Sequence, residues 1–206
     1  MSLPLIADRY RVKRELGRGG MAIVLEAEDG WLGGKLVALK LGRADVPKAR
    51  ERLAYEAALV GGVHHPHLLR LLGSVELLAP PPEVTNLGLV LELYNAASAL
   101  DWARGKSQAQ IAAVGARIAA GLSALHVLGV RHGDVSPMNV RVLSETDCKL
   151  IDFGLADRGV GQITAGTLRV MAPEALTGRP SPASDVYALA ATLADLAAPD
   201  AVRNPG

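Results

Sequence analysis

The chain has 206 residues, of which 50% are hydrophobic and 21% are charged, so it can bury a core and does not belong to the disordered class. Its formal net charge is +1 and only 3% of its residues are aromatic, which argues against nucleic acid as a partner. The single cysteine, Cys148, excludes an intrachain disulfide and a cysteine-rich zinc site.

We expect a cytoplasmic protein without a membrane segment. One cysteine fits a reducing compartment, and residues 1–8 lack the charged start and apolar core of a signal peptide. The most apolar stretch, residues 183–198, is interrupted by Asp185 and Asp195 and is shorter than the roughly 20 residues that span a bilayer.

The first part of the chain is predicted to consist mainly of strands, because its apolar runs are rich in Val, Ile and Leu. Residues 48–60 instead carry apolar side chains at helical spacing. This helix should end before Pro66, since the residue before a proline avoids the helical region. The expected strands cover residues 10–16, 23–28, 36–41, 68–78 and 87–93.

The second part is predicted to be mainly helical. Residues 111–128 form an amphipathic helix and residues 185–196 a further buried one. The apolar stripe of the longer helix consists of Ile111, Val114, Ile118, Leu122 and Leu125. Small and polar residues at 95–98 mark a boundary, so we expect two lobes, residues 1–94 and 95–206, within one domain.

Two features near the N-terminus are candidates for phosphate binding. Residues 17–24, with the sequence GRGGMAIV, join two expected strands, and glycines let backbone N–H groups approach phosphate oxygens. By itself this pattern is equally typical of a plain hairpin turn. Lys40 ends the run Val37-Ala38-Leu39, where a lone lysine is usually a solvated side chain.

Motifs further along the chain change that interpretation. They are HGDVSPMN at 132–139, DFG at 152–154, MAPE at 171–174 and DVY at 185–187. Together with Val-Ala-Leu-Lys and Glu56 they resemble, in order and spacing, the eukaryotic-like (bacterial-type) serine/threonine protein kinase superfamily. The resemblance implies an α+β, bilobal kinase-like fold, with an antiparallel N-lobe sheet plus a regulatory helix and a mostly helical C-lobe.

The resemblance also implies catalytic roles. Asp134 would accept or orient the proton of the attacking hydroxyl, and Thr167 would hydrogen-bond to Asp134. Lys40 would hold the α- and β-phosphates, with Glu56 as its ion-pair partner. Asn139 would complete the catalytic set.

The implied cofactors are ATP and Mg²⁺. Asn139 and Asp152 would ligate the metal, since amide and carboxylate oxygens are the hard ligands that Mg²⁺ prefers. The remaining nucleotide contacts would come from the glycine turn, an apolar roof over adenine and the backbone of the segment between the lobes. These residues are Gly17, Gly19, Val24, Ala38, Glu92 and Tyr94.

The histidines His64, His65 and His67 suggest a metal site, yet they resemble the loop after the family's regulatory helix, which is the interpretation we favour. Cys148 lies in an apolar segment, where a small buried hydrophobic side chain is expected.

Several positions depart from the family pattern. Gly133 replaces the usual arginine of the catalytic loop, so constitutive competence is more plausible than activation by a phosphate on the activation loop. Ser136 replaces a lysine near the γ-phosphate, which removes electrostatic stabilisation of the transferring group. Ala22 replaces the last glycine of the turn, and Arg141 stands where an apolar side chain usually forms the floor under adenine; its aliphatic stem could still cover the ring.

The sequence also stops soon after Glu174, so we expect a shortened C-lobe without its last helices. The 185–196 helix would then need cover for its apolar face, which predicts a partner protein, a protein substrate or a homodimer.

The predicted function is an ATP- and Mg²⁺-dependent protein serine/threonine kinase. Two alternatives stay open. Ser136, Arg141 and the missing helices would suit a nucleotide-binding pseudokinase scaffold. Gly133, in His-Gly-Asp, is also reminiscent of small-molecule kinases, or of an ATPase that acts in a complex.

Overall fold

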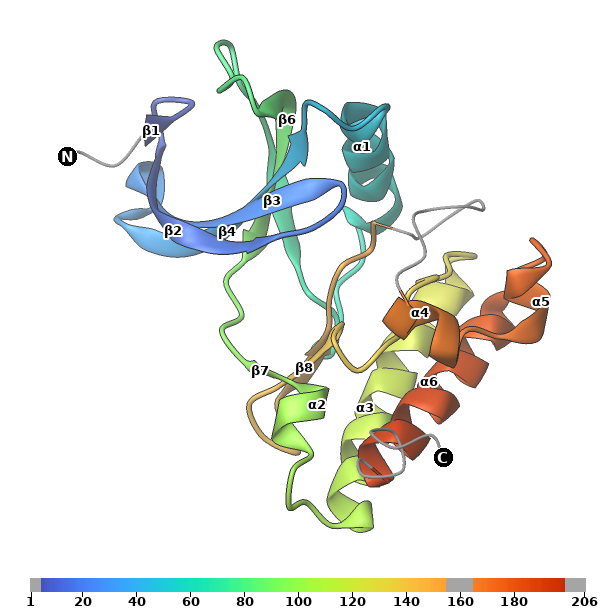
Figure 1. Ribbon diagram of the computed structural model, residues 1–206. Coiled ribbons are helices and arrows are strands. Elements are labelled where there is room, and N and C mark those ends of the chain that lie inside the picture. Colours follow the sequence, from blue (N-terminus) through green and yellow to red (C-terminus); the bar gives the residue numbers. More distant parts are fainter. Residues whose placement is uncertain (1–4, 155–164, 199–206) are drawn as a thin grey trace. The chain divides into compact units, whose positions relative to one another are not determined.

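The structure is a computed structural model in which residues 5–154 and 165–198 are described, the side chains of 165–167 excepted (Figure 1). The chain divides into two compact units. The first unit comprises residues 1–62 and 70–93, and the second comprises residues 63–69 and 94–206.

The first unit is built on an antiparallel sheet that has six strands among the described residues, in the order β1-β2-β3-β4-β6-β5. One helix, α1 (Ala49–Val60), and a short 3-10 helix, η1 (Gly30–Leu32), accompany it in the described part. The strands are β1 (Leu5–Ile6), β2 (Tyr10–Arg18), β3 (Ala22–Asp29), β4 (Lys35–Arg43), β5 (Leu71–Glu76) and β6 (Val84–Glu92).

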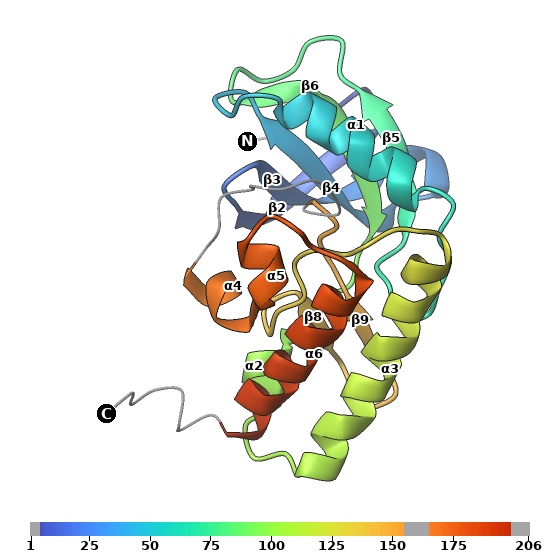
Figure 2. The same ribbon diagram turned by 90° about the vertical axis from the view of Figure 1, so that its right-hand side faces the viewer.

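The two faces of β4 carry different side chains because successive residues of a strand point to opposite faces. Val37, Leu39 and Leu41 belong to the buried apolar cluster of the unit. Lys40 alternates with them, so it lies on the other face. Helix α1 packs against β4, β5 and β6 (Figure 2). Gly42 permits this close approach, because a Cβ there would lie only 3.2 Å from Leu53.

The second unit is mainly helical. Its described residues also form an antiparallel sheet of three short strands, in the order β7-β8-β9. The strands are β7 (Ala97–Ser98), β8 (Val140–Val142) and β9 (Cys148–Leu150). The helices are α2 (Ala99–Trp102), α3 (Gln108–Val127), α4 (Ala165–Val170), α5 (Pro173–Leu176) and α6 (Pro182–Ala197).

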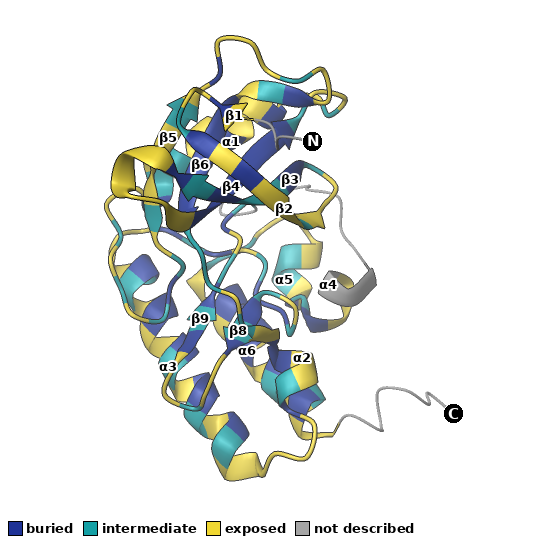
Figure 3. Ribbon diagram, turned by 90° about the vertical axis from the view of Figure 1, so that its left-hand side faces the viewer, coloured by how far each residue is buried: buried dark blue, intermediate teal, exposed yellow. Residues whose placement is uncertain are grey.

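Helix α3 forms the core of the second unit. All five residues of its predicted apolar stripe are buried, and Figure 3 shows the buried and exposed sides of the helix. Its N-terminus is fixed by a capping box between Ser107 and Gln110. Helix α6 packs along α3 (Figure 2), and a Cβ at Gly115 would lie 2.5 Å from Leu193. Gly115 therefore lets the two helices approach closely.

By length and composition alone, α3 could cross a membrane, with a mean hydropathy of 1.3. However, 39% of this apolar stretch is buried inside the protein, and the core helices of soluble proteins can be as long and as apolar.

The expected long strands and helices are present, with shifted ends. The strand predicted for 68–78 begins only at Leu71, because residues before it bond to the second unit. Leu69 N–H donates to the Leu150 carbonyl, and Leu150 N–H donates to the His67 carbonyl. The segment 63–69 therefore belongs to the second unit, although it was assigned to the first lobe from sequence.

Candidate active site

In the first unit, Lys40 and Glu56 form a buried ion pair. The Lys40 Nζ lies 2.9 Å from Oε1 and 2.8 Å from Oε2 of Glu56, and the two residues are 8% and 4% exposed. The predicted pairing is thus present. Buried charges are costly unless they are paired, and replacing such a pair by apolar residues often does not destabilise a protein. The pair therefore points to chemistry rather than to stability.

The glycine turn connects β2 to β3. Gly17 lies opposite Val24 in the sheet, and the Gly19 N–H donates to the Ala22 carbonyl at 2.9 Å. A Cβ at Gly17 would meet nothing within 4 Å, and one at Gly19 would come no closer than 3.7 Å to another atom. Packing within the protein does not require glycine at either position. The bare backbone instead leaves room for a ligand.

The residues expected around adenine share a face with Lys40. Val24 lies directly opposite Lys40, and Ala38 is two residues before it on the same strand. Ala38 is in turn opposite Leu91 of β6. Since directly opposite residues of an antiparallel pair share a face, these side chains form one small apolar surface beside the lysine.

Glu92 ends β6 and contacts the backbone of Arg70 twice, once through its own backbone and once through its side chain. Its N–H donates to the Arg70 carbonyl at 3.0 Å, and its Oε1 accepts from the Arg70 N–H at 2.8 Å.

In the second unit, Asp134 lies in an irregular loop and is held by Asn139. The Asn139 Nδ2 donates to Asp134 Oδ2 at 2.7 Å and to the Asp134 carbonyl at 2.9 Å. Both residues are half-buried. Because its amide nitrogen is used in this way, Asn139 presents Oδ1 as its acceptor.

The backbone before Asp134 is fixed by a buried carboxylate of α6. Asp185 accepts the N–H of His132 at 2.8 Å and that of Gly133 at 2.9 Å. It also lies 2.8 Å from Nε2 of His126 on α3. Sequence reasoning placed Asp185 in a family motif but missed this anchoring role, since partners so distant in sequence leave no local signal.

His132 is wholly buried and neutral in this arrangement. Its Nδ1 accepts the Asp134 N–H at 3.2 Å, which leaves Nε2 to donate to the Ile151 carbonyl at 3.1 Å. Burial lowers the pKa of His132, against the opposing charges of Asp185, Asp134 and Asp152. Its ring packs edge-on against Phe153, with centroids 5.1 Å apart.

Gly133 adopts a positive φ of 80°, a conformation that favours glycine. Glycine, where the family pattern has an arginine, therefore suits the backbone conformation at this position.

Asp152 follows β9, is exposed and also has a positive φ, 64°. Non-glycine residues in this region are strained and gather at functional sites. The Ile151 N–H donates to the Asn139 carbonyl at 2.8 Å, so the backbone holds the two expected metal ligands in neighbouring segments. One carboxylate and one amide oxygen fit the hard-ligand chemistry of Mg²⁺.

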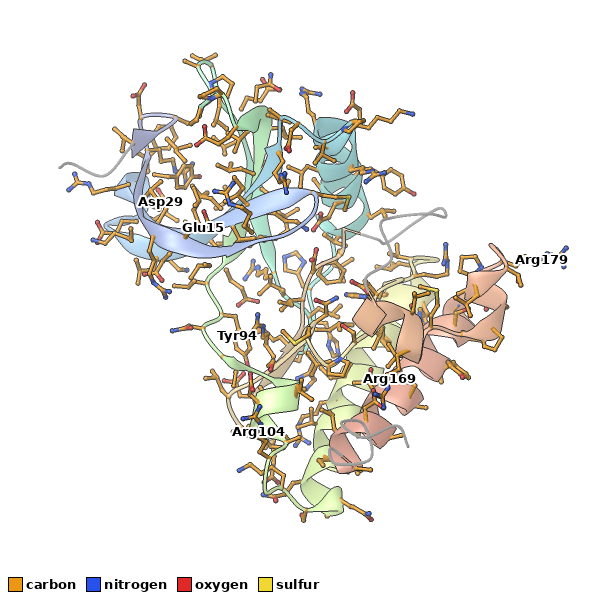
Figure 4. All side chains as sticks on the ribbon, in the orientation of Figure 1. Glu15, Asp29, Tyr94, Arg104, Arg169 and Arg179 are labelled. Atoms are coloured by element: carbon orange, nitrogen blue, oxygen red, sulfur yellow. The ribbon has the colours of Figure 1, made fainter. Side chains whose placement is uncertain are left out.

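Tyr94, labelled in Figure 4, begins the part of the second unit that would border adenine. Its hydroxyl donates to Asp147 at 2.8 Å, and the Lys149 ammonium lies 5.5 Å from its ring centre. Burial and the Asp147 hydrogen bond raise the Tyr94 pKa well above its usual range. Arg141 lies on β8, half-buried, and its Nη1 donates to the Ala96 carbonyl at 3.4 Å. Because the guanidinium of Arg141 is held by Ala96, its aliphatic stem can form the predicted floor under adenine.

The remaining predicted residues are more simply described. The backbone of Thr167 lies in α4, but its side chain is outside the described residues. Cys148 is fully buried, which raises its pKa to about 11, as expected for a packed side chain.

The histidines of the loop after α1 are bound within the protein. His67 Nδ1 donates to the Cys148 carbonyl, and His65 Nδ1 accepts the His67 N–H. In the described ranges no group of three or more His, Cys, Asp and Glu side chains could hold a metal.

Glu174 has a partner within the second unit. Its Oε1 accepts from the Ser184 hydroxyl at 2.7 Å, and this bond lowers the pKa of Glu174. Ser184 therefore joins α5 to the first turn of α6.

The sequence-family model described as "Protein kinase domain" matches residues 10–203 of the chain. The chain belongs to the protein kinase domain family, which confirms the predicted bacterial-type serine/threonine kinase superfamily and the α+β kinase fold.

Several curated bacterial proteins are similar. The "Probable serine/threonine-protein kinase CE0033" of Corynebacterium efficiens is 32% identical over 93% of this chain and 31% of its own length. Serine/threonine-protein kinase PknD of Mycobacterium tuberculosis is 34% identical over 90% and 29%, respectively. PknH of the same species is 33% identical over 89% and 30%. The chain thus spans about a third of the length of these relatives.

Proposed function

We propose that the chain is an ATP- and Mg²⁺-dependent phosphotransferase that acts on serine and threonine hydroxyls of proteins. The observation that carries this proposal is the hydrogen bond from Asn139 to Asp134 in a loop anchored by Asp185. Such a loop presents a half-buried carboxylate in a fixed position, as a group that accepts a proton must be. Family membership and the names of the relatives support the same reaction.

The step is the transfer of the γ-phosphoryl group. The hydroxyl oxygen of the substrate forms a bond to the γ-phosphorus, and the bond from that phosphorus to the oxygen bridging the β-phosphate breaks. The hydroxyl proton passes to Asp134. Lys40, held by Glu56, neutralises the α- and β-phosphates.

Asn139 and Asp152 would hold Mg²⁺, which supplies positive charge against the triphosphate. The backbone of Gly17 and Gly19 would face the phosphates. Val24, Ala38 and the backbone of Glu92 and Tyr94 would border adenine. Thr167 would hydrogen-bond to Asp134.

A cytoplasmic location and a partner protein or second copy over α6 remain proposals. Val186 and Tyr187 on α6 are 57% and 48% exposed, and they are the apolar side chains that such a partner would cover.

Transfer of radiolabelled γ-phosphate from Mg²⁺-ATP to the chain itself or to a generic protein tests the function. We expect labelled protein with the unsubstituted chain and loss of at least about 100-fold with Asp134→Asn, since a positioned proton acceptor contributes about that much. Asp195→Asn is the matched control, because Asp195 is a partly exposed acid that pairs with Arg169 in the same unit. Equal labelling by the unsubstituted chain and Asp134→Asn would contradict the proposal.

A further inference from the structure

Arg43, the last residue of β4, contacts the glycine turn at two points. Its Nη1 donates to the Gly19 carbonyl at 3.2 Å, and its backbone N–H donates to the Met21 carbonyl at 2.9 Å. Both contacts lie within the first unit. None of the motifs that identify the family includes this arginine, and the sequence pattern gave it no role.

The guanidinium of Arg43 is oriented before it reaches the turn. Asp45 accepts from Nε at 3.0 Å and also from Nη2, so the pair is bidentate. The Nη1 that remains is the nitrogen that reaches Gly19. An arginine fixed in this way loses less side-chain freedom on making the contact than a free one would.

The contact fixes a peptide plane. The described chain has no cis peptide bonds, so the Gly19 carbonyl and the Gly20 N–H point to opposite sides of the backbone. Whatever holds the carbonyl on one side therefore turns the Gly20 N–H to the other.

The alternation of side chains along β4 indicates toward which face of the sheet the Gly20 N–H points. Leu41 and Arg43 share one face of β4, whereas Lys40 lies on the opposite face. The register with β3 is regular up to Gly42, and the bond from the Arg43 N–H to the Met21 carbonyl continues that ladder by one pair. The pairing with β6 shifts between Leu41 and Arg43, so it is the ladder with β3 that keeps the alternation to the end of the strand. Arg43 draws the Gly19 carbonyl toward the face of Leu41. The Gly20 N–H is consequently turned toward the face of Lys40.

We propose that Arg43 is a positioning residue that aims the Gly20 N–H at the phosphates of a bound nucleoside triphosphate. The inference rests on the proposed function, because it assumes that Lys40 marks the phosphate side of the sheet. Arg43 itself does not contact the nucleotide. It acts through the peptide between Gly19 and Gly20, and the affected interaction is the one with phosphate rather than with the base.

Binding measured by titration calorimetry separates these contributions. We expect Arg43→Ala to weaken Mg²⁺-ATP binding about fivefold to tenfold, as for the loss of one well-aligned hydrogen bond, and to leave adenosine binding unchanged. Arg43→Lys keeps the charge and one donor but loses the bidentate fork, so its loss should be about half as large on the free-energy scale. Asp45→Ala should weaken Mg²⁺-ATP binding about twofold, because the guanidinium is then less oriented.

Arg14→Ala is the matched control, since Arg14 is an exposed arginine of the same sheet that pairs with Glu26. It should leave the affinities for both ligands unchanged. Equal weakening of ATP and adenosine binding by Arg43→Ala would mean a general structural role and would overturn the inference. An unchanged affinity for Mg²⁺-ATP would overturn it as well. If the unsubstituted chain does not bind Mg²⁺-ATP, the proposed function fails, and the inference fails with it.

Discussion

Lys40 and Asp134 are held in place by two different kinds of structure. Lys40 lies on a strand with a hydrogen-bonded neighbour on each side, Val24 on β3 and Leu89 on β6. Asp134 lies in a loop whose backbone is fixed by the single side chain of Asp185. A backbone ladder tolerates many side chains, whereas a loop anchored by one carboxylate depends on that residue. The candidate site residues of the two units should therefore respond differently to substitution.

The largest expected effect is the loss of the loop anchor. Asp185→Ala leaves the N–H groups of His132 and Gly133 and the ring of His126 without their acceptor. Each such loss costs about 1–3 kcal/mol, so we expect the free energy of unfolding to fall by about 4 kcal/mol. Urea denaturation measures this change.

Asp195→Asn on the same helix is the control and should change the free energy of unfolding by less than about 0.5 kcal/mol, since Asp195 pairs with Arg169 near the surface. A comparably small effect of Asp185→Ala would show that the loop does not depend on its anchor.

A somewhat smaller effect is expected from breaking the buried ion pair. Lys40→Met leaves the Glu56 carboxylate buried without its ammonium partner, which should cost about 3 kcal/mol in the free energy of unfolding. Adding Glu56→Gln should recover much of that loss, because the uncompensated charge is then gone. The double-mutant cycle, measured by urea denaturation, gives the coupling energy.

Lys13→Met is the matched substitution in an exposed pair of the same sheet, with Glu28, and should cost less than about 0.5 kcal/mol. Additive effects at Lys40 and Glu56 would argue that the pair contributes nothing as a pair. Strand β4 should stay in the sheet in the Lys40→Met/Glu56→Gln double variant. The loop of Asp134, in contrast, should lose its position when Asp185 is replaced.

The smallest effect concerns pH and the loop alone. The pKa of His132 is lowered in the folded chain, so the unfolded chain binds a proton at a higher pH than the folded chain does. Stability from this residue is complete above the unfolded pKa of about 6.5 and is lost as the pH falls below that value. Between about pH 7.5 and about pH 5.5 the loss from this group should reach up to about 1.3 kcal/mol.

His132→Asn removes the titrating group and keeps an acceptor for the Asp134 N–H. The free energy of unfolding of this variant should therefore fall less over the same pH range than that of the unsubstituted chain. Identical pH slopes for the two proteins would mean that His132 does not titrate differently on folding.

The elements predicted well are those with enough residues to show a pattern. The stripe of α3 is defined by five apolar side chains over about four turns, and all five are buried. Strands β7, β8 and β9 have two or three residues each, too few for alternation to be visible, and they were not predicted. Helices α2, α4 and α5 are one or two turns long and were missed for the same reason.

In the candidate site, too, residues that belong to a sequence motif were predicted and contacts between distant residues were not. The motifs named Lys40, Glu56, Asp134 and Asn139 because the chemistry restricts which residue types can stand there. The expected pair of Lys40 and Glu56 is present, whereas the hydrogen bond from Asn139 to Asp134 was not expected. The supporting contacts were not visible in the sequence, because the Ser184 hydroxyl reaches Glu174 only once α5 and α6 have packed together.

The sequence by itself determined the family, the order along the chain of the longer strands and helices, and the residues that we expect to carry the chemistry. Local spacing and residue chemistry are sufficient for these. Only the tertiary structure decided that residues 63–69 belong to the second unit, that Asp185 fixes the loop of Asp134 and that Arg43 holds the Gly19 carbonyl. Each of these depends on hydrogen bonds between groups far apart in the chain, and their geometry exists only once the elements have packed.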